Sequence, residues 1–355
     1  MERNAASTEP QENVAIVVTI ADAEPFFKEW LLFHLHSGFR CFYIYCDDES
    51  IGRSHCPYEK LAGKLATHYH AVFHFYYRAG QQRRACQYHE FSSAYLATME
   101  SEVMTRQEVN VRHAIDRARV HGQQWLLHID IDELFFLNGH TIQQYVSSLS
   151  ARSIASVNLR NYEVIPDPNT DAGFSFIGEK LVKKNFFYRG SWLFNSEQKQ
   201  YLTSISRVNQ NFFNYYQNGK SLFRVDIELA IKNVHSIRDR NSRYFYQGDT
   251  DPLILHFSCA SYNVFVEKYR RLGNFSDTWR DMPRAGQFLN ALHLKARDAL
   301  QNSHSAESQA LKNFFVESLC HSEEEIAQML KLDLVKKISI ERPSLEPEDR
   351  QSCAS

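Results

Sequence analysis

The residues best suited to chemistry form a short acidic run, His128-Ile129-Asp130-Ile131-Asp132-Glu133, which directly follows an apolar segment. The pattern predicts a strand over residues 125–131. Because side chains alternate between faces in a strand, Asp130 and Asp132 would share one face. Two nearby carboxylates repel each other by several kcal/mol at an effective dielectric constant of about 20, unless one is protonated or a cation lies between them. Divalent cations such as Mg²⁺ or Mn²⁺ bind in this way, with phosphate oxygens completing their coordination.

A solvated acidic strand end without a ligand is the simpler alternative, and the elements before the run argue against it. Residues 14–20 predict a buried strand, residues 24–37 a helix that ends at Gly38, and residues 42–46 a second strand. This order is a βαβ unit, whose crossover makes the two strands parallel. The second strand also ends in acids, Asp47-Asp48-Glu49. Because open α/β sheets bind ligands at the carboxyl ends of their strands, both acidic runs lie where a ligand would bind.

Beyond residue 50, the pattern alternates between further strands and helices. We expect strands over residues 71–76, 154–159, 186–188 and 253–257, and helices over 81–121, 141–149 and most of 261–337, with Ser322 opening the last helix. Residues 1–13 and 339–355 are expected to be disordered. The predicted fold class is α/β, with a mixed, mainly parallel sheet flanked by helices.

Composition excludes several broad classes of protein. The 355 residues carry 40 Lys and Arg against 42 Asp and Glu, so binding to nucleic acid through bulk positive charge is not expected. With 43% hydrophobic and 23% charged residues, the chain is not disordered as a whole. The seven cysteines are scattered without a Cys-x-x-Cys pair, which favours a reducing compartment over a disulfide scaffold. No signal peptide or membrane-spanning run is recognised, so we expect a cytoplasmic protein.

Three parts of the chain, in this order, resemble GT-A fold glycosyltransferases of the family 2 and family 92-like group. They are the strand and helix from Ala15 to Leu35 with the strand Phe42-Tyr43-Ile44-Tyr45-Cys46-Asp47-Asp48, the segment from Trp125 to Glu133, and the late pair Leu255-His256-Phe257-Ser258 and Phe265-Val266-Glu267-Lys268-Tyr269. The middle segment is similar to the group's Trp-x-x-x-x-Asp-x-Asp-Glu-Phe metal motif. The resemblance implies a nucleotide-sugar-binding half over residues 14–150 and an acceptor-binding half over residues 151–338.

The resemblance also implies an activity, namely metal-dependent transfer of a sugar from a nucleotide-sugar donor, usually UDP-linked, to an acceptor hydroxyl. Asp130 and Asp132 would hold Mn²⁺ or Mg²⁺ together with the donor. The residues that would line the nucleotide pocket are Thr19, Ala21 and Asp22, with Asp47 on the uracil or ribose side. The acceptor would be a glycan, protein, lipid or small molecule, and a nucleic-acid acceptor is the less favoured possibility.

Four further side chains each have two interpretations. His256 is either a third metal ligand or a core histidine, and His235 competes with it for the ligand role. Lys220, in Gly219-Lys220-Ser221, lacks the upstream glycine of a phosphate-binding P-loop. This lysine either places a cation near the diphosphate or is a solvated turn residue. Glu133 either orients a metal ligand or caps the following turn.

The catalytic base and the acceptor contacts stay open at the level of sequence. Enzymes of this group generally invert the anomeric centre, which requires a carboxylate base beside the acceptor. The candidate bases are Asp167, Asp226 and Asp251. Trp192 and the run Phe186-Phe187-Tyr188 would stack on an acceptor sugar or belong to the core. Two other functions compete with transfer: a catalytically inactive nucleotide-sugar-binding or interaction protein of the same fold, and a metal-dependent phosphodiesterase or nuclease.

Overall fold

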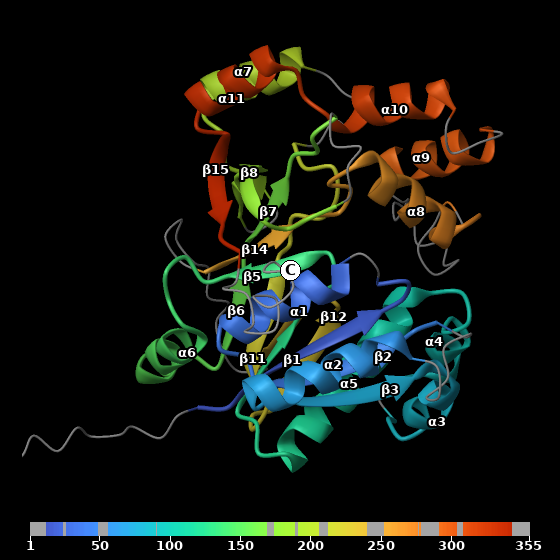
Figure 1. The fold of residues 1–355 in the computed structure, drawn as a ribbon, viewed down its shortest axis with the longest axis vertical. Coiled ribbons are helices and arrows are strands. Elements are labelled where there is room, and N and C mark those ends of the chain that lie inside the picture. The colour runs from blue at the N-terminus through green and yellow to red at the C-terminus, as the bar shows by residue number, and fades with distance from the viewer. Residues whose placement is uncertain are drawn as a thin grey trace, which may run out of the picture.

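The computed structural model describes residues 12–23, 26–48, 56–89, 91–168, 174–188, 191–205, 212–239, 252–275, 277, 291–303 and 308–342. Within these ranges, two larger sheets and the helices that cover them carry most of the core (Figure 1). No helix in this part of the chain is long and apolar enough to cross a lipid bilayer.

The first sheet has six strands in the order β3-β2-β1-β4-β11-β6. Its members are β1 (Val14–Ile20), β2 (Cys41–Cys46), β3 (Val72–Tyr77), β4 (Trp125–His128), β6 (Ser156–Leu159) and β11 (Lys220–Arg224). Strands β1 to β4 pair in parallel, whereas β11 is antiparallel to both of its neighbours. The predicted α/β class with a mixed, mainly parallel sheet flanked by helices is therefore confirmed.

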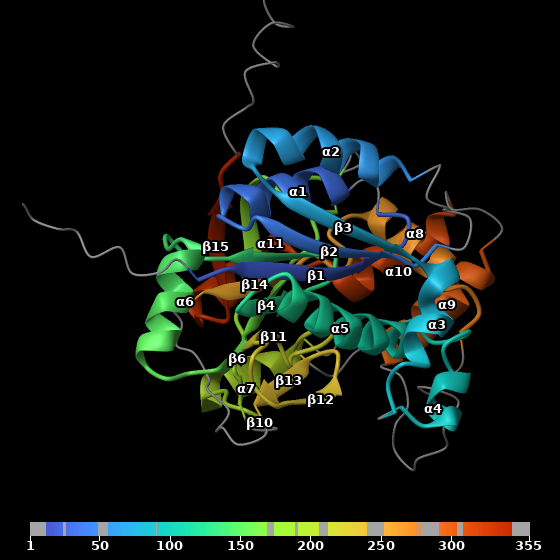
Figure 2. The same cartoon turned by 90° about the horizontal axis from the view of Figure 1, so that it is seen from below.

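Helices cover both faces of this sheet. Figure 2 shows α1 (Phe26–His36) and α2 (Pro57–Tyr69) on one face and α5 (Val103–Val120) on the other. Helix α1 forms where predicted because its apolar residues fall on one side, with Phe27 and Trp30 wholly buried. Gly38 follows the helix with a φ of +100°, a value that favours glycine.

The second sheet has five strands in the order β15-β8-β7-β14-β5. Its members are β5 (Glu133–Phe136), β7 (Asn161–Val164), β8 (Gly178–Lys183), β14 (Leu253–His256) and β15 (Val335–Ile340). Only four residues, 129–132, separate β4 in the first sheet from β5 in the second. The acidic run is therefore the place where the chain crosses between the sheets.

The remaining elements are short helices and two hairpins. The helices are α3 (Gln81–Ala85), α4 (Ser93–Ala97), α6 (Ile142–Ala151), α7 (Ser196–Ser204), α8 (Tyr262–Leu272), α9 (Ala291–Gln301), α10 (Gln309–Leu319), α11 (Glu323–Lys331) and the 3₁₀ turn η2 (Arg78–Gly80). The hairpins pair β9 (Phe187–Tyr188) with β10 (Ser191–Trp192) and β12 (Leu229–Asn233) with β13 (Ser236–Asp239). Thr141 and Ser322 cap α6 and α11 with reciprocal capping boxes, which confirms both predicted helix starts.

Three of the predicted elements are wrong in extent or type. The strand expected over 125–131 ends at His128, so Asp130 and Asp132 do not share a strand face. The helix expected over 81–121 is divided into α3, α4 and α5. The helical prediction up to residue 337 fails at β15, whose alternation of buried and exposed side chains is that of a strand. Ser339 and Ile340, assigned to the expected disordered tail, are the last residues of β15.

Candidate functional site

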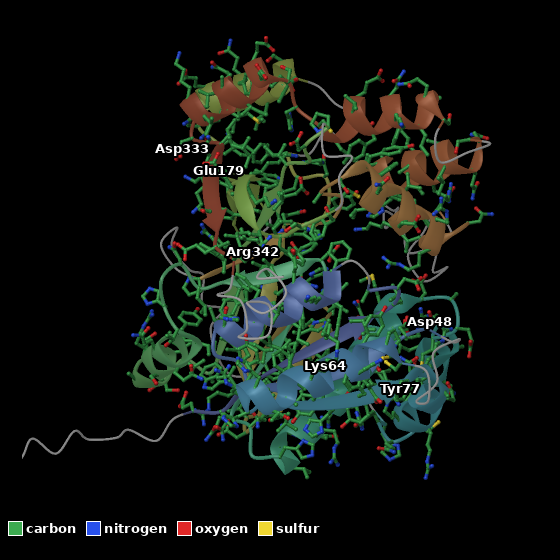
Figure 3. The ribbon with its side chains drawn as sticks, in the orientation of Figure 1. Asp48, Lys64, Tyr77, Glu179, Asp333 and Arg342 are labelled. Atoms are coloured by element: carbon green, nitrogen blue, oxygen red, sulfur yellow. The ribbon has the colours of Figure 1, made fainter. Side chains whose placement is uncertain are left out.

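The parallel strands of the first sheet all end at one edge, and the candidate site lies there. Figure 3 marks this edge by Asp48, which follows β2, and Tyr77, which ends β3. In the register of β1 and β4, Val17 pairs with His128, so the residues after His128 continue past the end of the ladder beside Thr19. We call residues Ile129–Asp132 the acidic turn.

Among the described residues, Lys220 has the cationic group closest to the acidic turn. Its Nζ lies 2.5 Å from Oδ2 of Asp130 and 3.5 Å from Oε2 of Glu133, and none of its side chain is exposed. The other oxygen of Asp130 accepts a hydrogen bond of 2.7 Å from Nε2 of Gln107. The N–H of Asp130 donates to Oε2 of Glu133 at 2.7 Å. The first aspartate of the acidic turn is thus bonded through both carboxylate oxygens.

The pKa values of the two carboxyl groups beside Lys220 are shifted in opposite directions. Burial opposes ionisation of Asp130, but the ammonium of Lys220 outweighs it and holds the pKa of that carboxyl below its usual range. Burial raises the pKa of Glu133 well above its usual range, despite the same ammonium, and the charges of Asp130 and Asp132 raise it further. Burial would lower the pKa of Lys220, yet the two acidic neighbours raise it above its ordinary value. The shifts of Asp130 and Lys220 thus both favour a charged pair, whereas burial favours the neutral form of Glu133.

Asp132 faces two other groups, and its contacts with them are longer than those of Asp130. Its Oδ2 lies 3.8 Å from Nε2 of His256 on β14 and 3.7 Å from Nζ of Lys268 on α8. The ammonium of Lys268 also lies 4.5 Å from the ring centre of Tyr215 and donates to the carbonyl of Ser258 at 3.2 Å. Burial opposes ionisation of Asp132, but Lys268 and His256 hold the pKa of this carboxyl well below its usual range.

Several buried polar atoms around the acidic turn have no hydrogen-bond partner among the described residues. They are Oε1 of Glu133, Nε2 of His128, Nδ1 of His256 and the hydroxyl of Tyr216. The Tyr216 ring lies between His235 and His256, with ring centres 4.3 and 4.7 Å away. An unsatisfied buried polar atom costs about 1–3 kcal/mol. Buried polar atoms of this kind bind water, an ion or a ligand.

Helix α5 positions the strand ends, which the sequence analysis did not predict. Besides Gln107, two side chains of α5 bond to the ends of strands. Arg106 pairs bidentately with Asp47, just after β2, at 2.8 to 3.0 Å. Asn110 donates to Oγ1 of Thr19 on β1 at 3.1 Å. Arg106 and Asn110 lie four residues apart and are almost completely buried. Two buried polar residues on one helix face are the signal that could have revealed this role.

The residues predicted to line a nucleotide pocket lie at the carboxyl ends of β1 and β2, and they differ in their contacts and exposure. Both carboxylate oxygens of Asp47 accept from Arg106, so this side chain is part of an ion pair. The carbonyl of Ala21 accepts from Nη1 of Arg271 on α8 at 2.8 Å. Asp22 is exposed and has a φ of +43°.

The two candidate bases that the structure describes, Asp167 and Asp226, do not gather at the acidic turn. Asp226 pairs with Arg224, which lies opposite Trp125 at the start of β4. Asp226 therefore lies near the amino end of β4, whereas the acidic turn follows its carboxyl end. Asp167 is exposed beyond the end of β7, and Asp251 lies outside the described residues.

The remaining predicted residues have structural contacts. His235 has its Nδ1 3.2 Å from the carbonyl of Gly219. Burial lowers its pKa to about 3, so the ring is neutral and donates to that carbonyl. Trp192 stacks on Phe194 and packs edge-on against Phe213, which agrees with the core alternative. Among the described residues, no three His, Cys, Asp or Glu side chains are arranged to hold a metal ion.

Comparison with known proteins gives distant relatives. No family model matches the chain. It is 26% identical over 175 residues to the Arabidopsis thaliana protein "Glycosyltransferase-like At2g41451", covering 48% of this chain and 38% of that protein. It is 22% identical over 249 residues to "Glycosyltransferase-like At3g57200" from the same plant, covering 69% of this chain and 46% of that one. The chain thus spans less than half the length of the curated relatives it matches.

Two of the similar solved structures have low sequence identity to the chain. S. aureus TarS is 10% identical, with 82% of this chain and 44% of that chain covered and a TM-score of 0.32. Mouse xyloside xylosyltransferase 1 is 7% identical, with 44% and 53% covered and a TM-score of 0.25.

Proposed function

We propose that this chain is a metal-dependent glycosyltransferase that moves a sugar from a UDP-linked donor to an acceptor hydroxyl with inversion of the anomeric centre. The observation that carries the proposal is the acidic turn at the carboxyl edge of the first sheet, where Lys220, Lys268 and His256 meet it among unpartnered buried polar atoms. The glycosyltransferase-like names of both plant relatives support the same activity.

The side chains at Asp132 fit a divalent cation. Its Oδ2 and the Nε2 of His256 are 3.8 Å apart. Two atoms at this separation can bind the same ion when each bond is about 2.1 Å long. A carboxylate and an imidazole are suitable ligands for Mn²⁺, with diphosphate oxygens taking further positions. The bound ion would supply neutralisation of the charge that develops on the leaving diphosphate.

The lysine on α8 would bind the diphosphate itself. An ammonium has three N–H donors, so the donation of Lys268 to Ser258 leaves it the capacity to bind a phosphate oxygen. Its side chain is 17% exposed, whereas that of Lys220 is wholly buried, so Lys268 is the more accessible of the two to an incoming anion. Thr19 and Ala21, at the end of β1, would contact the nucleoside.

Calorimetric titration of UDP and of GDP, with Mn²⁺ or with a chelator, tests the proposal. We expect UDP to bind more tightly with Mn²⁺, and Asp132→Asn or His256→Gln to weaken binding at least about 10-fold. Asp226→Asn is the matched control, because it makes the same change of carboxylate to amide at the far edge of the sheet. It should leave UDP affinity unchanged.

The outcomes distinguish the competing functions. Absence of nucleotide binding under every metal condition would overturn the proposal. Metal-dependent UDP binding without transfer from any of a panel of UDP-sugars to glycan, peptide or lipid acceptors would favour the inactive nucleotide-sugar-binding alternative. NMR of a transfer product reads the anomeric configuration and tests inversion directly.

A further inference from the structure

The two aspartates of the acidic turn have different surroundings. Asp130 already accepts short hydrogen bonds at both oxygens, from Lys220 and from Gln107. Each oxygen keeps a second lone pair, but a divalent cation bound to Asp130 would lie beside the ammonium of Lys220 and be repelled by it. The contacts of Asp132 Oδ2 with Lys268 and His256 are 3.7 and 3.8 Å long, beyond hydrogen-bond length. Of the two aspartates, Asp132 is therefore the one with the longer contacts to described cationic side chains.

Lys220 is fixed in its place by charge. Its side chain has no exposed surface, and two carboxyl groups lie within 3.5 Å of its ammonium. The Tyr216 ring lies on another side of the ammonium, with its centre 5.3 Å away. Moving a buried charge away from its charged partners is strongly unfavourable. The ammonium would therefore not leave Asp130 to make room for a metal ion.

The backbone holds Lys220 as well. Lys220 begins β11 and pairs with Leu159 of β6. Gly219, just before it, has a φ of +72° and lies so close to Leu159 that a Cβ would overlap the Leu159 carbonyl oxygen. Only glycine fits such a position. The start of the lysine side chain thus cannot shift without breaking the contact of two strands.

We propose that Lys220 is a permanent internal cation of the acidic turn, which neutralises Asp130, withdraws that carboxylate from metal coordination and leaves Asp132 as the carboxylate of the acidic turn that binds the divalent cation. The inference rests on the proposed function for the identity of the cation site and extends it by giving the two aspartates different roles. Lys220 is then a positioning residue that acts through Asp130.

Binding of Mn²⁺ to the protein without nucleotide, followed by electron paramagnetic resonance, tests this division of roles. We expect Asp132→Asn to weaken Mn²⁺ binding at least about 10-fold and Asp130→Asn to change it by less than about threefold. Lys220→Met leaves Asp130 and Glu133 without their cation and should strengthen Mn²⁺ binding about 10-fold or more. Adding Asp130→Asn to Lys220→Met should remove that gain.

Lys232→Met provides the matched control, because Lys232 is an exposed lysine on β12. Its Mn²⁺ affinity should equal that of the wild type. The inference is overturned if Asp130→Asn weakens binding as much as Asp132→Asn does, or if folded Lys220→Met binds Mn²⁺ no more tightly than the wild type. Should circular dichroism show that Lys220→Met does not fold, the comparison of the two aspartate variants decides alone.

The absence of nucleotide keeps this result separate from the proposed function. Failure of the metal experiment leaves a positive UDP titration standing, and failure of UDP to bind leaves the metal affinities of the variants interpretable.

Discussion

Lys183 and Glu163 form an ion pair inside the second sheet, with Nζ 3.0 Å from Oε1 and both side chains at most 3% exposed. The same carboxylate accepts the backbone N–H groups of Asn214 and Tyr215 at 2.9 Å. Glu163 lies level with His256 in the register of β7 and β14. The pair thus fixes the segment 214–216, whose Tyr215 and Tyr216 rings lie at the candidate site.

Loss of the lysine from this pair should be costly. Lys183→Met leaves a buried carboxylate without its cation, so the free energy of unfolding should fall by about 3–5 kcal/mol. Lys337→Met removes a partner from the exposed pair with Glu179 and should cost less than about 1 kcal/mol. Urea unfolding measures both. Hydrogen exchange should also accelerate at the amides of Asn214 and Tyr215, and equal costs in the two variants would contradict this account.

Two glycines with similar φ values should respond differently to alanine. Gly219 and Gly122 have φ of +72° and +70°, but a Cβ at Gly122 meets no atom within 4 Å. Gly122→Ala should therefore cost about 1 kcal/mol, from backbone strain alone. Gly219→Ala adds an overlap with the Leu159 carbonyl and should cost roughly 3 kcal/mol or more. Chemical denaturation of both variants checks the difference, and a Gly219→Ala protein as stable as Gly122→Ala would refute the close approach.

The ion pair between Asp47 and Arg106 should show strong coupling. Both side chains are less than 10% exposed and bond bidentately. Arg106→Met should lower the free energy of unfolding by about 3–5 kcal/mol, because Asp47 keeps a buried charge. The double variant with Asp47→Asn should lose clearly less than the sum of the two single variants. Strict additivity in this double-mutant cycle would mean that the two groups do not interact.

Buried His34 should make the protein sensitive to acid. Its Nδ1 donates to the carbonyl of Trp30 and its Nε2 accepts the N–H of Phe135, so the folded state needs the neutral ring. Burial lowers the pKa of His34 to about 3, against about 6.5 in the unfolded chain. Between these values only the unfolded state binds the proton. This contribution to stability is therefore complete above pH 6.5 and is lost as the pH falls toward 3, at about 1.4 kcal/mol per pH unit.

Replacement of the ring isolates this effect. Between pH 6.5 and 5, the wild type should lose about 2 kcal/mol more stability than His34→Gln. His36→Gln, on the same helix but exposed, should behave like the wild type. Urea unfolding at both pH values provides the comparison. If His34→Gln loses as much stability as the wild type, another group is responsible for the acid sensitivity.

Much of the first sheet could be predicted because burial on both faces leaves a continuous apolar pattern. Strand β1 is buried along its whole length, and its run from Val14 to Ile20 is recognisable without any tertiary information. The acidic turn misled the prediction because Ile129 and Ile131 alternate with acids as they would in a strand. The turn forms instead because Asp130 meets Lys220, which is 90 residues away in sequence. No local pattern contains that contact.

Other parts of the site also depend on distant partners. Strand β15 was missed because its hydrogen bonds go to β8, more than 150 residues earlier. Arg106, Gln107 and Asn110 look like ordinary polar helix residues until α5 packs against the strand ends. The order of acidic residues along the chain therefore predicted that both acidic runs follow strand ends, whereas the partners of each acid came only from the fold.

The central place of β11 in the first sheet has a consequence for synthesis of the protein. β11 lies between β4 and β6, yet it follows both of them along the chain. At about 5–20 residues per second, roughly 5–20 s pass on the ribosome between the end of β4 and the end of β11. During that time one edge of β4 has open backbone groups, and Asp130 has no cation. A nascent chain of this length therefore presents an open strand edge, with which other chains can pair, until β11 has been synthesised.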